Sequence, residues 1–365
     1  MSRNKRNSHH RRGSAIGLVV KVIILLILVC VLVNVYQNRD SYGDGSLGKF
    51  GEVFSFLDNY AKEHPNEANT GTVSVSDDNM KNYTNIVLFG VDSTKGSLDD
   101  STRTDSIIIM SINNLTKETK LVSVYRDTYL NVGDDKYTKC NAAYAYGGAD
   151  QAIDMLNSNL DMNISDYITI GFGGLSDIID DIGGVTITVE EDEIDHLNNY
   201  QSTMATELGK TYVPVTAAGE QKLNGLQAVA YCRIRYTAGN DFKRTSRQRD
   251  VLMGTINGIR SSSPSVMFSV AKDLSSSTKT SLSLIDVIKL LGGITKYKIS
   301  DTSGFPFTDG ITTANLGSSK GDCVIPVTLS SNVTELHSYL FGTQNYTPSD
   351  TVQSYSAQIK SDSGT

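Results

Sequence analysis

Short runs of apolar, mostly β-branched residues alternate along this chain with segments whose apolar residues recur at helical spacing. The runs predict strands at residues 86–89, 107–112, 121–124, 185–189 and 229–234. The segments between them predict helices at 150–160, 175–182 and 247–259. Alternation of this kind favours a layered α/β fold.

An apolar segment near the N-terminus divides the chain. Residues 15–36 are apolar except for Lys21 and Asn34, which is long enough for a helix to cross a hydrocarbon layer of roughly 30 Å. Residues 1–14 are basic, so we expect this end to stay in the cytoplasm and the remainder to lie outside the cell. The alternative is a cleaved signal peptide, but its apolar core is usually shorter and no small-residue cleavage site follows Tyr36.

The rest of the chain divides into three parts. Residues 37–83 are polar and rich in Gly, Asn, Asp and Ser, which predicts a stalk. Residues 84–345 form the patterned body, which includes an apolar helical pattern at 282–291. Residues 346–365 are rich in Ser and Asp, and we expect them to be disordered.

The part of the chain beyond the apolar segment is acidic. The first 36 residues hold six of the 33 basic residues and none of the 40 acidic ones. Because phosphate contacts supply most non-specific affinity for nucleic acid, we expect no nucleic-acid partner. A local cluster of basic residues in this acidic body is therefore informative.

One such cluster lies in residues 231–249. It contains six basic residues and one acid, namely Arg233, Arg235, Lys243, Arg244, Arg247, Arg249 and Asp241. Arg233 and Arg235 would share a face of the predicted strand, and Arg244 and Gln248 would share a face of the helix that follows. Guanidinium groups suit bidentate phosphate recognition, so we expect an anion site. The alternative is a solvated basic face.

A second cluster flanks the first three predicted strands. Asp92 follows the first strand. Arg103 and Asp105 precede the second, and Arg126 follows the third. Side chains at the mouths of neighbouring strands commonly form the site in α/β sheets. Asp92 and Asp105 would suit Mg²⁺ (or Mn²⁺) bound together with substrate phosphates, although aspartates at turns and helix caps are a common alternative.

Seven segments resemble, in order, the motifs of the LytR-CpsA-Psr family. They are residues 85–93, 103–113, 120–130, 139–148, 171–185, 219–235 and 241–249, beginning with NIVLFGVDS and ending with DFKRTSRQR. The resemblance covers residues 85–260, and an N-terminal membrane anchor fits it. It implies an α/β/α sandwich around a central mixed β-sheet. It also implies an enzyme that transfers teichoic acid, capsule or a related anionic glycan from undecaprenyl pyrophosphate to peptidoglycan, leaving polyprenyl monophosphate.

The resemblance also implies roles for individual residues. By motif position, Asp92 and Asp105 match the family's Mg²⁺-binding acids. The implied pyrophosphate-binding set is Arg103, Arg126, Arg233, Arg235, Arg244 and Gln248. The catalytic candidates are Asp105, Arg126 and Asp241, with Asp241 orienting an arginine or a water, and no general base is assigned.

The chain departs from the family pattern at four positions. Thr94 stands where Arg is common, which would reduce phosphate contacts, and Tyr125 stands where Pro is usual. Cys140 and Cys232 replace residues that are usually aliphatic. We predict that these cysteines form a disulfide beside the site, the alternative being two buried free thiols.

A prenyl tail would need an apolar slot beside the anion site. The candidates for its lining are Leu175, Ile178, Ile179, Leu252 and Ile256. For each of them, plain core packing is the alternative.

Three other functions stay open at this point. A pyrophosphatase would use the same arginines and metal, with water as the acceptor. A transcriptional attenuator is suggested by the family's historical name, but no helix-turn-helix with a basic recognition helix is evident. A glycan-binding module would not require clustered Asp and Arg. The whole pattern predicts a single-pass protein of the cell membrane with an extracellular catalytic domain, from a Gram-positive type of bacterium, and it does not identify the glycopolymer.

Overall fold

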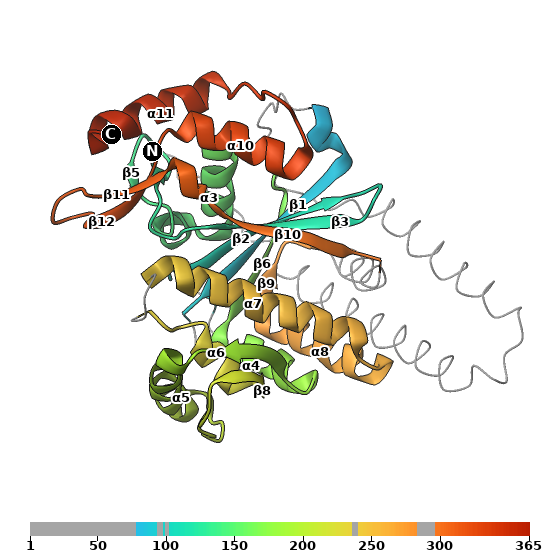
Figure 1. The fold of residues 1–365 in the computed structure, drawn as a ribbon. Helices are drawn as coiled ribbons and strands as arrows, with labels where there is room; N and C mark the ends of the chain where they lie inside the picture. The colour runs from blue at the N-terminus through green and yellow to red at the C-terminus, as the bar shows by residue number, and fades with distance from the viewer. Residues whose placement is uncertain (1–77, 93–97, 99–101, 236–239, 283–295) are drawn as a thin grey trace, which may run out of the picture.

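The computed structural model describes residues 78–92, 98, 102–235, 240–282 and 296–365. The predicted cytoplasmic tail, the predicted membrane helix and most of the predicted stalk lie outside these residues, as do Thr94 and nearly all of the helical pattern at 282–291. Within the described part, no helix combines the length and the apolar composition that a membrane span requires. The body has helices on both faces of a mixed β-sheet (Figure 1).

The central sheet has six strands in the order β10-β3-β2-β1-β6-β9. Their bounds are β1 Tyr83–Val91, β2 Thr104–Asn113, β3 Glu118–Val124, β6 Asp166–Gly171, β9 Thr278–Thr280 and β10 Lys298–Phe305. β1 pairs antiparallel with β2 and parallel with β6, whereas β3 pairs antiparallel with β2 and parallel with β10. The predicted mixed sheet and its first three strands are therefore confirmed.

The strand directions bring several chain segments to one edge of the sheet. β1, β3, β6 and β10 end at this edge and β2 begins there. Asp92, Asp105 and Arg126 therefore lie along a single edge. The β1–β2 register shifts between Gly90 and Val91. A bulge of this kind re-aims the side chains beside it.

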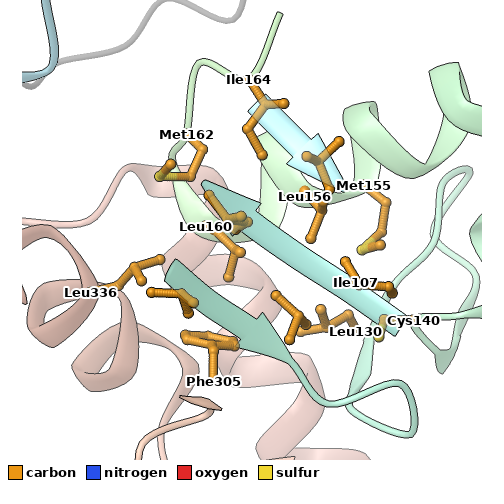
Figure 2. Packing of buried hydrophobic residues seen from close by; sticks show 14 of the residues in the cluster. Ile107, Leu130, Cys140, Met155, Leu156, Leu160, Met162, Ile164, Phe305 and Leu336 are labelled. Carbon is orange, nitrogen blue, oxygen red and sulfur yellow. The ribbon is translucent and has the colours of Figure 1, made fainter. Parts of the chain in front are cut away.

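One face of the sheet packs against three helices, α3 (Ala142–Leu160), α10 (Leu329–Phe341) and α11 (Asp350–Ser363). The short 3-10 helices η2 (Asp78–Asn82) and η4 (Thr308–Gly310) and two small sheets, β4 (Tyr129–Asn131) with β5 (Tyr137–Lys139) and β11 (Ile311–Asn315) with β12 (Asp322–Pro326), complete this layer. Its core joins side chains of the sheet and helices, among them Ile107, Leu156, Phe305 and Leu336 (Figure 2).

Helices α4 (Phe172–Asp181), α7 (Asn240–Ser261) and α8 (Pro264–Ser277) lie on the opposite side of the sheet (Figure 1). Beyond α4, a hairpin of β7 (Val185–Val189) and β8 (Gly219–Leu223) packs with η3 (Glu191–Glu193), α5 (Ile194–Leu208) and α6 (Gly225–Tyr231). The predicted strand at 185–189 is confirmed, but it belongs to this hairpin. The three predicted helices are confirmed within α3, α4 and α7.

The predicted strand at 229–234 is wrong, because most of this segment belongs to α6 and the turn after it. The helix begins at a capping box. Asn224 Oδ1 accepts a hydrogen bond from Gln227 N, and Gln227 Oε1 accepts one from Asn224 N, each at 2.9 Å. Every residue of α6 is buried. A short helix buried on all sides shows no helical periodicity, so its sequence resembles a buried strand.

The predicted disorder of residues 346–365 is also wrong, since most of the tail forms α11. Ser349 caps the helix and donates to the buried carboxylate of Asp161 from both its backbone N (2.7 Å) and its Oγ (2.6 Å). Val352 and Ile359 are fully buried in the main core. Together with the partly buried Tyr355, they form the apolar stripe that packs this otherwise polar helix against the core.

Candidate active site

A polar pocket of about 210 Å³ lies at the edge of the sheet where β1 ends and β2 begins. Its lining residues are Asp92, Asp105, Phe172, Tyr200, Cys232, Arg233, Arg235, Arg244 and Gln248. They come from the sheet edge, α4, α5, the turn after α6 and the first turns of α7. The fold thus brings members of both charge clusters into one pocket.

Asp105 forms ion pairs with two arginines at this pocket. Its Oδ1 accepts a hydrogen bond from Arg126 Nη1 at 2.6 Å, and Arg235 Nη2 lies 3.4 Å from the same oxygen. The side chains of Asp105 and Arg126 are only 17% and 18% exposed, so solvent screens this ion pair weakly. Asp105 thereby links Arg235, which lines the pocket, to Arg126, which is not itself among the lining residues.

Arg233 is held by an acid and two aromatic rings. Its Nη2 lies 3.4 Å from Asp92 Oδ2, and its guanidinium carbon lies 5.0 Å from the ring centroid of Phe172 and 5.6 Å from that of Tyr200. Such cation–π contacts place a guanidinium without using its N–H donors, which stay available to an anion. Phe172 and Tyr200 were missed in the sequence, because no charge pattern or spacing singles them out.

A buried ion pair supports the turn that carries Arg233 and Arg235. Arg247 Nε donates to Glu193 Oε1 at 2.7 Å, with both side chains 1% exposed, and Arg247 Nη1 donates to the carbonyl oxygen of Ile234 at 3.0 Å. Because Ile234 lies between the two arginines, this bond fixes the turn. No local sequence pattern identifies Glu193, which lies 54 residues before Arg247.

The other predicted site residues are placed as follows. Arg244 is buried and Gln248 follows one turn later on α7, and both line the pocket, as their shared helical face requires. Arg233 and Arg235 reach the pocket from a turn, not from a strand. Arg103 is exposed just before β2 begins, and it is not among the residues that line the pocket. Asp241 lies in α7, and its side chain falls outside the described ones.

The acids of the pocket suit a cation that is shared with a phosphate. Asp92 and Asp105 both line the pocket, and each contacts an arginine. Among the described residues, no three His, Cys, Asp or Glu side chains converge as a protein-only metal site. Mg²⁺ often uses one or two carboxylates together with substrate phosphates. This pair of donors therefore fits Mg²⁺ only in company with a phosphate-bearing ligand.

An apolar cavity of about 310 Å³ adjoins the polar pocket. It runs between the sheet and α7, and its wall is almost entirely hydrocarbon. The proposed tail-slot residues that line it are Leu175, Ile178, Leu252 and Ile256. The fifth candidate, Ile179, follows the alternative of plain core packing and lies in the core with the β7–β8 hairpin. The residues that line both spaces are Asp105, Phe172, Cys232 and Gln248, so the two spaces meet there.

The predicted disulfide between Cys140 and Cys232 is wrong, because both are free thiols. Cys140 lies in the core beside α3, and its Sγ is 3.3 Å from the carbonyl oxygens of Tyr125 and Arg126 (Figure 2). Cys232 lies in the separate core of α6 and the β7–β8 hairpin. The two cores lie on opposite faces of the sheet, which keeps the thiols apart. Burial raises the pKa of the Cys232 thiol to about 12, so this thiol is neutral at physiological pH.

Tyr125, the other departure from the family pattern, packs beside the site. Its ring contacts that of Phe242 edge to face, with centroids 4.6 Å apart. Its hydroxyl lies over Gly304 of β10, where an added Cβ would come within 2.1 Å of Tyr125 Oη. A glycine at 304 therefore makes room for this tyrosine.

Comparison with known sequences finds one family and several named relatives. The model of the LytR_cpsA_psr family matches residues 51–309. A polyisoprenyl-teichoic acid–peptidoglycan teichoic acid transferase, TagU of Bacillus licheniformis, is 33% identical over 63% of this chain and 70% of its own length. TagT of Bacillus subtilis, of the same description, is 30% identical over 70% of this chain and 78% of its own. Biofilm regulatory protein A of Streptococcus mutans is 29% identical over 76% of this chain and 66% of its own length.

Comparison with solved structures finds the same fold. The crystal structure of Bacillus subtilis TagV is 26% identical, with a TM-score of 0.56 over 73% of this chain and 99% of that one. A structure described as TagT bound to LI-WTA is 22% identical, with a TM-score of 0.53 over 82% and 98%. A further TagT structure, described with bound octaprenyl pyrophosphate lipid, is 22% identical with a TM-score of 0.50 over 82% and 98%.

Proposed function

This chain belongs to the LytR_cpsA_psr family, and we propose that it is a membrane-anchored phosphotransferase that moves an anionic glycopolymer from undecaprenyl pyrophosphate to peptidoglycan. The anchor is the apolar segment 15–36, with the basic N-terminus in the cytoplasm and the catalytic domain outside the cell. The glycopolymer would be teichoic acid, capsule or a related anionic polymer.

The observation that supports this proposal is that the polar pocket and the apolar cavity adjoin. The polar pocket offers arginines and two acids, the adjoining cavity offers hydrocarbon, and four residues line both. A polyprenyl pyrophosphate has the same two halves, a charged head and an apolar tail. A soluble phosphate ester would need only the first space, and a simple apolar ligand only the second.

The relatives support the same substrate class. Those named TagU and TagT are described as transferases of teichoic acid from a polyisoprenyl carrier to peptidoglycan. The fold is shared with TagT structures described with LI-WTA and with octaprenyl pyrophosphate. These descriptions concern the relatives, and for this chain they favour a lipid-linked donor over a nucleotide donor.

In the proposed reaction, a peptidoglycan hydroxyl oxygen attacks the phosphorus atom that carries the glycan. The bond from that phosphorus to the bridging oxygen breaks, the hydroxyl loses its proton, and polyprenyl monophosphate leaves. Arg126, Arg233 and Arg235 would offset the negative charge that grows on the departing phosphate. Asp92 and Asp105 would hold Mg²⁺ (or Mn²⁺), which when bound supplies further positive charge at the phosphates.

The test uses the full chain in lipid vesicles with Mg²⁺, a polyprenyl-pyrophosphate-linked saccharide and peptidoglycan oligomers. We expect phosphodiester-linked saccharide on peptidoglycan by mass spectrometry, lost on addition of EDTA. Arg126→Ala should lower the transfer rate by roughly 10²–10³-fold. Arg126→Lys keeps the charge but not the planar, bidentate guanidinium, so its rate should lie between those of Arg126→Ala and the unaltered protein. Polyprenyl monophosphate without saccharide on peptidoglycan would favour a pyrophosphatase. Transfer of saccharide to peptidoglycan in the presence of EDTA would contradict the proposed requirement for a metal ion.

A further inference from the structure

We propose that the sheet edge opposite the polar pocket rests on the surface of an anionic lipid bilayer. This bilayer-facing edge consists of η2, the β2–β3 turn (residues 114–117) and the start of β10. The proposal rests on the membrane anchor and lipid substrate of the proposed function. It goes beyond them by stating which surface meets the membrane and how the prenyl tail reaches the cavity.

Hydrogen bonds join the three segments of this edge into one surface. Asn114 N donates to the carbonyl oxygen of Asn82 at 2.9 Å, and Thr84 Oγ1 donates to Asn114 Oδ1 at 3.0 Å. Lys298 N donates to the carbonyl oxygen of Lys117 at 2.9 Å. Because β1 begins at this edge, the N-terminal anchor connects to the domain here. In Figure 1 the β2–β3 turn and the start of β10 lie together at the right of the sheet.

The tip of the edge presents an apolar side chain from an ordered turn. Leu115 is 78% exposed, more than any other large hydrophobic side chain in the described part of the chain. The turn is held by Asn113 Oδ1, which accepts from the backbone N of Leu115 (2.9 Å) and of Thr116 (3.0 Å). A leucine held out from an ordered turn is suited to the boundary between headgroups and acyl chains.

The charge around Leu115 complements an anionic surface. The segments of this edge and the residues next to them carry four lysines, namely Lys81, Lys117, Lys296 and Lys298. The acids are Asp78, which pairs with Lys81, and Glu118. Basic residues therefore outnumber acids at this edge of a chain whose formal charge is −7. Lysines near an anionic membrane surface are attracted to its negative potential. A neutral protein partner would fit Leu115 but would leave these lysines unused.

The apolar cavity reaches the same edge. Asp105 and Gln248 line it at the site end, and Ile112, Tyr297 and Ile299 line it at the other. From Ser106 to Ile112, β2 spans about 20 Å at roughly 3.4 Å per residue. A prenyl tail could therefore pass from the bilayer along the sheet while its pyrophosphate occupies the pocket. The lipid would not have to leave the membrane completely.

The test exploits the absence of tryptophan from this sequence. Leu115→Trp would place a single fluorescent reporter at the edge, and Tyr212→Trp, at a 42% exposed residue in the loop after α5, is the matched control. Both full chains are reconstituted in vesicles that contain anionic and brominated lipids. We expect the Leu115→Trp emission to shift to shorter wavelength and be quenched by bromine, and the Tyr212→Trp emission to be unaffected. Adding Lys117→Glu and Lys298→Glu should reduce the quenching.

Sedimentation of the vesicles separates the two ways in which this idea can fail. A full chain that does not sediment with the vesicles would overturn the anchor, and the orientation with it. A chain that sediments, but whose Leu115→Trp reporter is quenched no more than the control, would overturn the orientation alone. Neither result depends on whether the protein transfers a glycan.

Discussion

At the scale of single residues, the arginines of the site divide into two kinds. Arg247 is buried against Glu193 and holds the turn, whereas Arg235 is 39% exposed and faces Asp105 across the pocket. Removing one partner of a buried ion pair leaves an uncompensated charge, which costs about 3–5 kcal/mol, whereas an exposed pair contributes about 0–1 kcal/mol.

We therefore predict that Arg247→Met lowers the free energy of unfolding by about 3–5 kcal/mol. Arg235→Met should lower it by at most about 1 kcal/mol while weakening pyrophosphate binding. Denaturant unfolding and binding of a prenyl pyrophosphate measure the two effects. Equal losses of stability in both variants would remove the distinction between supporting and ligand-facing arginines.

At the scale of elements, α7 serves both halves of the site. Its first turns contribute Arg244 and Gln248 to the pocket, and its later turns contribute Leu252 and Ile256 to the cavity. Leu252 and Ile256 are only partly buried although they are apolar, because they face the cavity. A larger side chain here should fill space that a prenyl tail would use.

We predict that Leu252→Phe leaves the free energy of unfolding unchanged or raises it, and weakens binding of prenyl pyrophosphates but not of inorganic pyrophosphate. Leu156→Phe, in the fully packed core, is the matched control and should cost about 1–3 kcal/mol of stability. Calorimetric titration and thermal unfolding provide the measurements. Unaltered prenyl binding by Leu252→Phe would place the tail elsewhere.

The C-terminal helix gives a second test at this scale. Ile359 is 1% exposed and Lys360 beside it is exposed. We predict that Ile359→Ala lowers the free energy of unfolding by about 2–5 kcal/mol and that Lys360→Ala changes it by less than about 0.5 kcal/mol. Denaturant unfolding checks both values. If the tail were disordered, neither substitution would lower the free energy of unfolding.

Across the whole molecule, the sequence predicts what depends on periodicity and charge. Strands β1 to β3 follow from short apolar runs, and the helices within α3, α4 and α7 follow from apolar residues at helical spacing. Acids and arginines beside the strand ends indicated the pocket. α6 was missed because it is buried on all sides. α11 was missed because its apolar packing positions, Val352, Tyr355 and Ile359, are few in a segment rich in Ser and Asp. Contacts between distant segments, such as Glu193 with Arg247, have no local sequence signal.

The absence of a local signal for contacts between distant segments also explains why the predicted disulfide is wrong. Cys140 and Cys232 both stand beside site motifs in sequence, but the sheet lies between them in space. The arrangement of both faces around one edge also places the charged pocket and the apolar cavity end to end. This arrangement, more than any single residue, favours a lipid-linked pyrophosphate as the substrate.

In the proposed reaction, a peptidoglycan hydroxyl, and not water, accepts the glycan phosphate. The most direct measurement runs the complete reaction in water enriched in oxygen-18 and determines the mass of every phosphate product. Transfer to peptidoglycan should give a glycan–peptidoglycan phosphodiester and a polyprenyl monophosphate, neither of which contains oxygen-18. A glycan phosphate that carries one oxygen-18 atom, with none of the glycan on peptidoglycan, would show that water is the acceptor and that the protein is a hydrolase.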